Sequence, residues 1–336
     1  MKTKFSCDFT TIKEFLIDKA LILVLGLIIV LIIGRAPSFF QYRVFKDILI
    51  QSSVKIIVAL GMMIPLLLGG TDLAGGRQVG LAAVIVASLS QMSTYASLFW
   101  PNLPELPIII PILAALAVGS MIGFANGIMI VKFKMAPFIA TYAMSTIVYG
   151  ANCLYYAKEP NDAQPIGGIR TSLTNLASYK FGGKIDCLIV IALVAVLIIW
   201  FMLNKTAFGK KIYAVGGNIE AAKVAGINVG IILIAGYVIE SNLVSFAGIL
   251  EVARTGGANS AYGLNYDFDA IAACVVGGVS LSGGIGKVSG AVLGVFIFTI
   301  ISYGLAFVGV NPNWQLIVKG VIIAVAVALD MRKNVR

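Results

Sequence analysis

Long apolar runs dominate this chain and restrict it to a fold that crosses a lipid bilayer. A membrane-spanning helix needs about 20 mostly apolar residues. Ten segments approach that requirement: residues 20–34, 48–68, 79–100, 107–131, 137–157, 185–203, 231–250, 270–281, 288–310 and 314–329. Because 59% of the residues are apolar and only 12% are charged, the composition is far from that of a soluble domain. We therefore predict an all-α membrane protein, a polytopic bundle of about ten transmembrane helices that forms a single domain over residues 1–336. The first and eighth runs are short, so eight or nine spans are the alternatives.

The basic residues report on topology rather than on nucleic-acid binding. The net charge is +10, but the lysines and arginines stand at the ends of apolar runs and form no basic stripe. The excess of positive charge, including Lys205, Lys210 and Lys211, predicts that both termini and residues 204–230 lie in the cytoplasm. Residues 21–33 have the length of a signal-peptide core, but a poor cleavage site follows, so we expect a membrane anchor.

Several classes of chemistry are excluded by the residues that the chain lacks. The sequence contains no histidine, and its four cysteines are scattered without a CxxC spacing, so we expect no metal site and no catalytic residues. A membrane enzyme such as a lipid transferase would need clustered carboxylates or histidines at one interface. Residues 283–290 superficially resemble a nucleotide-binding loop, but Leu281 and Val288 occupy the required glycine and hydroxyl positions. We expect no cofactor, with any ATP bound by a separate partner subunit.

One polar segment, residues 204–230, interrupts the apolar runs and is here called the handle. Asn218 suits the start of a short helix over residues 219–225, Glu220 suits its first turn, and Gly226 suits its end. A short helix that projects from a membrane face can lie in a groove of a partner protein and transmit its motion. A solvated loop without a partner is the alternative.

Two glycine-rich segments, residues 69–76 and 277–284, resemble one another, since they share both glycine pairs and the leucine between them. Glycine pairs interrupt helices, and lipid cannot solvate the freed backbone groups. Such breaks survive at depth only inside protein or along a water-filled path, and transporters place them around the substrate route. The equal alternative is a pair of ordinary cytoplasmic turns.

Two further glycine ladders predict close helix contacts, because glycines four residues apart line one helix face. They are Gly119, Gly123 and Gly127 in the fourth run, and Gly286, Gly290 and Gly294 in the ninth. Packing within one chain is favoured over a dimer seam for both ladders.

Glu240 lies near the middle of the seventh run, too deep for its carboxylate to reach the interface. An ionisable residue at that depth is costly unless it faces the bundle interior. We expect Glu240 either to pair with a lysine or to line the route, with structural pairing slightly favoured.

The handle resembles the segment that couples sugar-importing ABC permeases of the ribose, xylose and galactose group to their ATPase. The resemblance rests on Ala-Val-Gly-Gly-Asn, Glu-Ala-Ala-Lys-Val-Ala-Gly-Ile, and the stretches 51–60, 70–84, 269–279 and 309–320. It covers nearly the whole chain from about residue 48, and Thr-Asp-Leu followed by Gly-Gly-Arg-Gln-Val-Gly is typical of the galactose branch. Pro65 in the second run and Glu240 depart from that branch's pattern, and Pro65 is expected to kink its helix.

The resemblance implies a permease subunit in the bacterial cytoplasmic (inner) membrane that imports a monosaccharide by alternating access. The expected sugar is galactose or methyl-galactoside, and the alternative is another sugar such as ribose or xylose. Its implied partners are a second copy in a homodimer, a cytoplasmic ABC ATPase, an extracytoplasmic sugar-binding protein and membrane lipid, with no nucleic acid. An ion-coupled secondary transporter is the alternative class. The residues expected to couple to the ATPase are Gly209, Lys210, Gly216, Gly217, Asn218, Glu220, Ala221, Ala222 and Gly226. Those expected along the substrate path are Asp72, Gly75, Gly76, Glu240, Asp269, Gly277 and Gly278.

Overall fold

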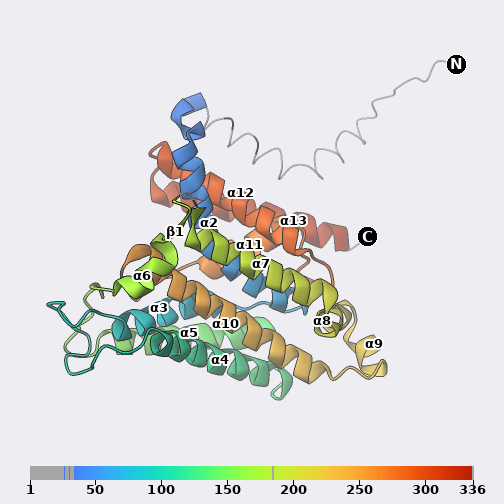
Figure 1. The fold of residues 1–336 in the computed structure, drawn as a ribbon. Helices are drawn as coiled ribbons and strands as arrows, with labels where there is room; N and C mark the ends of the chain where they lie inside the picture. Colours follow the sequence, from blue (N-terminus) through green and yellow to red (C-terminus); the bar gives the residue numbers. More distant parts are fainter. Residues whose placement is uncertain (1–25, 27–29, 31–33, 184, 335–336) are drawn as a thin grey trace. The chain divides into compact units, whose positions relative to one another are not determined.

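The computed structural model describes Gly26, Val30, residues 34–183 and residues 185–334, and nearly all of its regular structure is helical (Figure 1). The elements in chain order are η1 (Pro37–Phe40), α2 (Tyr42–Leu67), α3 (Gly75–Leu89), α4 (Ile109–Val131), α5 (Pro137–Tyr156), α6 (Thr171–Ser178), β1 (Lys180–Phe181), β2 (Ile185–Asp186), α7 (Cys187–Lys205), α8 (Ala207–Gly217), α9 (Ile219–Val224), α10 (Val229–Thr255), α11 (Tyr266–Val276), α12 (Val288–Phe307) and α13 (Pro312–Asn334). The predicted first span, residues 20–34, falls almost entirely outside the described residues.

The chain divides into two compact units, which are described separately. The smaller unit joins the part of the chain up to Ile48 to residues 296–336. Within it, Phe39, Val44 and Ile48 form a small apolar cluster with Tyr303, whose hydroxyl donates to the Asp47 carboxylate at 3.1 Å. The larger unit comprises residues 49–295 and contains every predicted site residue.

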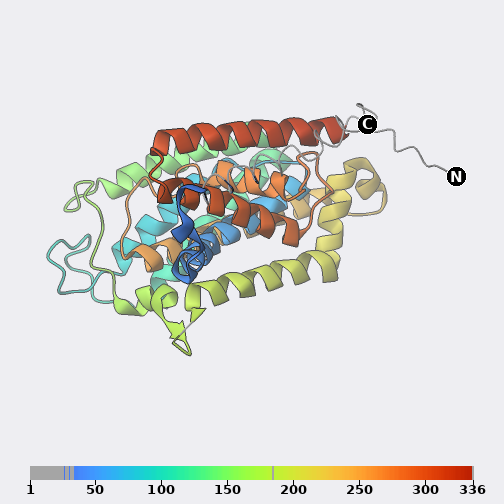
Figure 2. The same ribbon diagram turned by 90° about the horizontal axis from the view of Figure 1, so that it is seen from above.

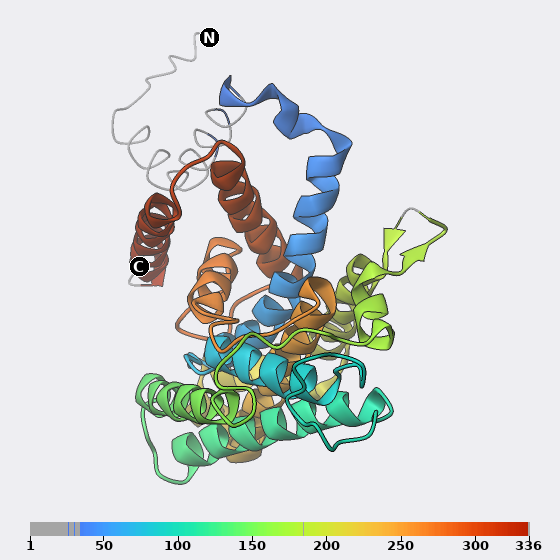
Figure 3. The ribbon, with the colours of Figure 1, turned by 90° about the vertical axis from the view of Figure 1, so that its left-hand side faces the viewer.

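Helix α10 organises the larger unit by packing against both α3 and α4 (Figure 3). The first glycine ladder explains this contact. A Cβ at Gly123 would lie 2.7 Å from the Ser241 hydroxyl, and one at Gly127 would lie 2.8 Å from the backbone of Ile234. Because glycine has no side chain, the backbones of α4 and α10 can approach closely, as small residues allow between helices in lipid. The expected packing within one chain is confirmed for this ladder.

The second ladder serves α11 and α12 in the same way. A Cβ at Gly290 would collide with the carbonyl of Gly277, and one at Gly294 would collide with the carbonyl of Ala273. These are contacts within the chain as well, so neither ladder is free over its full length to form a dimer seam.

Five helices of the described residues are long and apolar enough to cross a membrane: α2, α4, α7, α10 and α12. Most predicted runs correspond to one helix each, but two are shorter than predicted. Helix α3 has 15 residues and α11 has 11, lengths of about 22 Å and 16 Å at 1.5 Å per residue. Both fall short of the roughly 30 Å hydrocarbon core, so each crosses only part of it.

The predicted span over residues 79–100 is wrong in its second half, because α3 ends at Leu89. The residues that follow form a loop that Gln91 holds together. Its side-chain nitrogen donates to the carbonyl of Gly167 at 2.9 Å, and its side-chain oxygen accepts the backbone N–H of Phe99 at 2.7 Å. Figure 2 shows this loop at the end of the larger unit opposite α8 and α9. A local hydropathy pattern cannot register such a long-range side-chain contact.

Candidate functional site: a buried helix break and the handle

The segment between α2 and α3 is a helix break enclosed by protein. Asp72, Leu73 and Ala74 are all buried. The Leu73 N–H donates to the Thr141 hydroxyl of α5 at 3.1 Å, and that hydroxyl in turn lies 3.3 Å from the carbonyl of Thr71. Side chains of a neighbouring helix thus satisfy backbone groups that lipid could not. For this segment, the structure favours the enclosed break over an ordinary exposed turn.

Two buried carboxyl groups meet at this break. The Asp72 Oδ1 accepts the backbone N–H of Ala74 at 2.6 Å, and its Oδ2 accepts the Asn126 side-chain N–H of α4 at 3.1 Å. Glu240 of α10 is fully buried and accepts the Ser241 hydroxyl at 3.1 Å, and a Cβ at Gly75, the residue after Ala74, would lie 3.1 Å from its Oε1. The expectation that a lysine pairs with Glu240 is wrong, because its carboxyl forms no ion pair with any basic side chain that the structure describes.

The first turns of α3 and α11 pack against one another beside this pair. A Cβ at Gly76 would lie 2.8 Å from both the Asp267 carboxylate and the Gly263 carbonyl. Asp267 is buried, whereas Asp269, the residue predicted for the path, is only half-buried. Helix amino termini carry partial positive charge, so two of them meeting here favour the acidic residues that gather around them.

The second glycine-rich segment differs from the first despite the shared pattern. Gly75 and Gly76 open a helix, but the corresponding Gly283 and Gly284 adopt φ values of +89° and +70° in a turn. Gly277 is half-buried and Gly278 is exposed. The segment therefore lies nearer the surface of the unit than the first one does.

The handle contains two helices, α8 and α9, joined at Asn218 (Figure 1). The Asn218 side chain accepts the Ala221 N–H at 2.9 Å, Glu220 pairs with Lys223 at 2.7 Å, and Gly226 follows with φ +78°. The predicted short helix is confirmed and ends one residue early. The preceding helix α8, which begins behind a Thr206 cap, was missed, although the Thr-x-x-Gly start is a recognisable cap.

The predicted coupling residues divide by exposure. Gly209 and Ala222 are buried, and Gly216 is half-buried, so these three pack inside the unit. The others are exposed: Lys210, Gly217, Asn218, Glu220, Ala221 and Gly226. Two apolar side chains of α9 that were not predicted are also exposed, Ile219 by 43% and Val224 by 91%.

The handle contacts the end of α2 and the second glycine-rich segment directly. A Cβ at Gly216 would collide with the carbonyl of Leu67, which is the last residue of α2. That carbonyl accepts the Gly284 N–H at 2.9 Å. The Tyr213 hydroxyl of α8 donates to the Gly286 carbonyl at 2.9 Å, and burial raises the pKa of Tyr213, so the phenol keeps its donor hydrogen. Movement of α8 would therefore bear on the ends of α2 and of the second glycine-rich segment.

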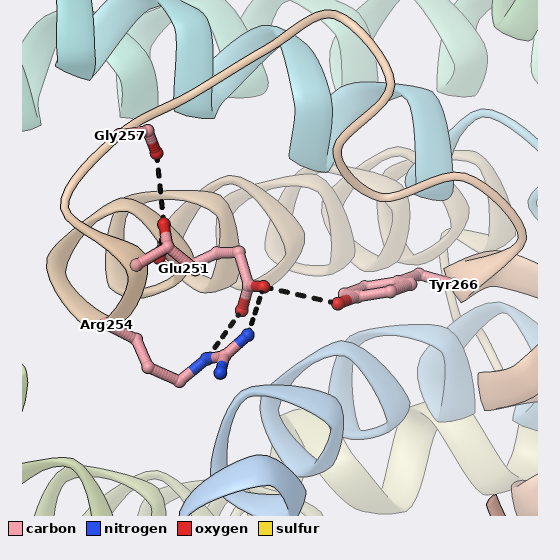
Figure 4. Close-up of polar contacts among 5 residues, drawn as sticks. Glu251, Arg254, Gly257 and Tyr266 are labelled. Atoms are coloured by element: carbon pink, nitrogen blue, oxygen red, sulfur yellow. Dashed lines mark hydrogen bonds and ion pairs between the residues drawn. The ribbon is translucent and has the colours of Figure 1, made fainter. Parts of the chain in front are cut away.

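A separate polar cluster lies at the far end of α10, opposite the handle. Figure 4 shows the Arg254 guanidinium forked onto the Glu251 carboxylate, with distances of 2.6 Å and 3.3 Å, while Tyr266 donates to the same carboxylate at 3.4 Å. Glu251 thus has a basic partner, unlike Glu240.

Asn126, Gln78 and Asp267 belong to the buried break and were not predicted. The predicted path contains only acidic residues and glycines, so it omits the two amides, and it includes Asp269 in place of the more deeply buried Asp267. Asn126 was detectable in principle, because it is a polar residue within an apolar run and precedes the ladder glycine Gly127.

The chain belongs to the family described as branched-chain amino acid transport system / permease component, whose model matches residues 44–327. Among its relatives, the galactose/methyl galactoside import permease protein MglC of Haemophilus influenzae is 45% identical over 97% of this chain and 96% of its own length. MglC of Escherichia coli is also 45% identical, over 96% of each chain. The ribose import permease protein RbsC of Escherichia coli is 33% identical over 96% of each chain. No solved structure matches this chain.

Proposed function

We propose that this chain is the membrane-spanning permease subunit of an ATP-driven importer that brings galactose or methyl galactoside into the cytoplasm. The observation that carries the proposal is the 45% identity to two galactose/methyl galactoside import permeases over almost their whole length. The ribose permease is more distant, at 33%, so ribose and xylose are second candidates for the sugar.

The handle supports the proposed link to a separate ATPase. Helix α9 exposes Val224 by 91% and Ile219 by 43% beside the cationic Lys210 and Lys211 of α8. Apolar side chains on a short projecting helix fit a hydrophobic groove of a partner. We place this helix and both termini in the cytoplasm on the positive-inside rule, with a homodimer in the inner membrane and a sugar-binding protein on the opposite side.

In this mechanism, closure of the ATPase moves the handle, and the handle moves the helix ends that it touches. Gly216 contacts the end of α2, and the Tyr213 hydroxyl holds Gly286 just before α12. A rigid-body shift of α8 would therefore reach two helices at once and switch which side of the permease is open. The buried Asp72 and Glu240 are not open to solvent in this structure, so their place on the sugar path requires a different conformation.

The handle is tested most cleanly at an exposed position. A bulky residue at Ala222 would disturb α9 itself, since Ala222 is only 3% exposed, whereas Val224 contacts solvent. Val224→Glu should reduce galactose uptake at least tenfold in cells that express the partner ATPase, because a carboxylate cannot enter an apolar groove without desolvation. Val224→Leu is the matched control and should transport normally. Normal uptake by Val224→Glu at equal membrane levels would remove α9 from the coupling mechanism.

A further inference from the structure

We propose that Asp72 and Glu240 form a proton-binding site in the membrane interior, with one proton held between the two carboxyl groups. Both carboxyl groups lie at the start of α3: Asp72 Oδ1 accepts the Ala74 N–H at 2.6 Å, and a Cβ at the next residue, Gly75, would lie 3.1 Å from Glu240 Oε1. Two carboxylate anions have no hydrogen to share, because an ionised carboxylate is only an acceptor. A shared hydrogen therefore needs one neutral carboxyl group, which donates its O–H to the other.

Asp72 and Glu240 are too deeply buried for water to stabilise a negative charge on both carboxyl groups. Asp72 is 1% exposed and Glu240 is 0% exposed. Within the residues that the structure describes, neither carboxyl forms an ion pair with a basic side chain. One negative charge is stabilised by the Ala74 and Asn126 N–H groups that Asp72 accepts. A second one next to it would be repelled and unsolvated.

Unpartnered oxygens around the pair point to the same missing hydrogen. If both groups are counted as carboxylates, Glu240 Oε1 has no donor, and the side-chain oxygens of Gln78 and Asn126 have none either. All three residues are at most 1% exposed. Buried acceptors without a donor are rare in folded proteins, and a proton on the pair supplies one for Glu240 Oε1.

The charged and titratable groups that face the pair do not offer a substitute. Tyr237 of α10 interacts with both carboxyls, and Asp267 of α11 interacts with Asp72. The guanidinium of Arg77 stacks over the Tyr149 ring, 4.2 Å from its centroid. From α4 and α5, the neighbours are the neutral Asn126 and Thr141. The proton therefore fixes α10 to the break between α2 and α3.

Infrared spectroscopy of the full-length chain in lipid nanodiscs tests the proposal without any transport assay, so the result does not depend on the proposed function. At neutral pH, the spectrum should contain the carbonyl band of a protonated carboxylic acid, and Glu240→Gln should remove it. The amide of the variant still donates a hydrogen to Asp72, so the fold should persist. Glu251→Gln, three turns along the same helix, is the matched control and should leave the band intact, because Glu251 is paired with Arg254. An identical band in Glu240→Gln would overturn the proposal.

A second measurement addresses the same proton through stability. Raising the pH should lower the thermal unfolding midpoint of the wild-type chain as the shared proton leaves and two adjacent negative charges repel. The decline should be smaller in Glu240→Gln, which has no proton to lose at that position. Equal pH profiles for the two proteins would contradict the proposal. Restoration of the alkaline midpoint by sodium would also contradict it, since the pair would then bind a metal cation instead.

Discussion

Asn126 of α4 donates a hydrogen bond to the Asp72 carboxyl of the buried pair, although the two residues are 54 positions apart in sequence. Its amide donates to Asp72 Oδ2 at 3.1 Å in a site with no solvent, since Asn126 itself is 0% exposed. A buried acceptor that loses its donor loses about 1–3 kcal/mol of stability. The contribution of this single amide should therefore be measurable.

Asn126→Leu should lower the free energy of unfolding by about 1–3 kcal/mol. The loss should be measurable as a lower thermal unfolding midpoint. The matched control is Asn242→Leu on α10. Asn242 is half-buried and bonds to the neutral Ser120 hydroxyl at 2.9 Å, so its loss should cost less. Equal losses of stability in the two variants would show that the Asp72 carboxyl needs its donor no more than the neutral Ser120 hydroxyl does.

At the scale of the elements, glycine position decides how closely α4 and α10 pack. The sequence predicts the Gly119, Gly123 and Gly127 ladder as a contact face, and the structure supplies the partner, α10. The partner was not deducible, because a ladder specifies a flat helix face but not which helix covers it. The half-length of α3 was also not predicted, since residues beyond Leu89 are held in a loop by contacts with distant residues.

Gly123→Ala should destabilise the bundle, because its Cβ would lie 2.7 Å from the Ser241 hydroxyl and 2.8 Å from the Ser241 Cβ. Overpacking of this kind costs about 1–3 kcal/mol. Gly150→Ala on α5 is the control: no atom lies within 4 Å of the added Cβ, and alanine favours the helix by about 1 kcal/mol. Thermal unfolding in nanodiscs should move in opposite directions for the two variants. A neutral or stabilising Gly123→Ala would mean that α10 can move aside freely.

At the scale of the whole molecule, the source of energy separates the two transport classes. An ATP-driven importer should stop when cellular ATP is depleted and should continue when an ionophore collapses the ion gradients while ATP is maintained. A secondary transporter should show the reverse. The proton proposed for Asp72 and Glu240 is consistent with the first class, because both groups are buried in this structure. Uptake that fails with the ionophore alone would contradict the proposed function.

The sequence by itself determined the properties that depend on neighbouring residues. Apolar runs of about 20 residues specify membrane-spanning helices because a helix satisfies its own backbone hydrogen bonds within lipid. The Asn218 cap and Gly226 specify α9 because capping involves residues within one turn of each other. Only the tertiary structure decided the environment of Asp72 and Glu240, and the contact of Gly216 with the end of α2. Those contacts join distant segments, such as Gln78 and Ser241, which are 163 residues apart. Helix packing decides which residues meet at that separation. Hydropathy along the chain does not predict how the helices pack.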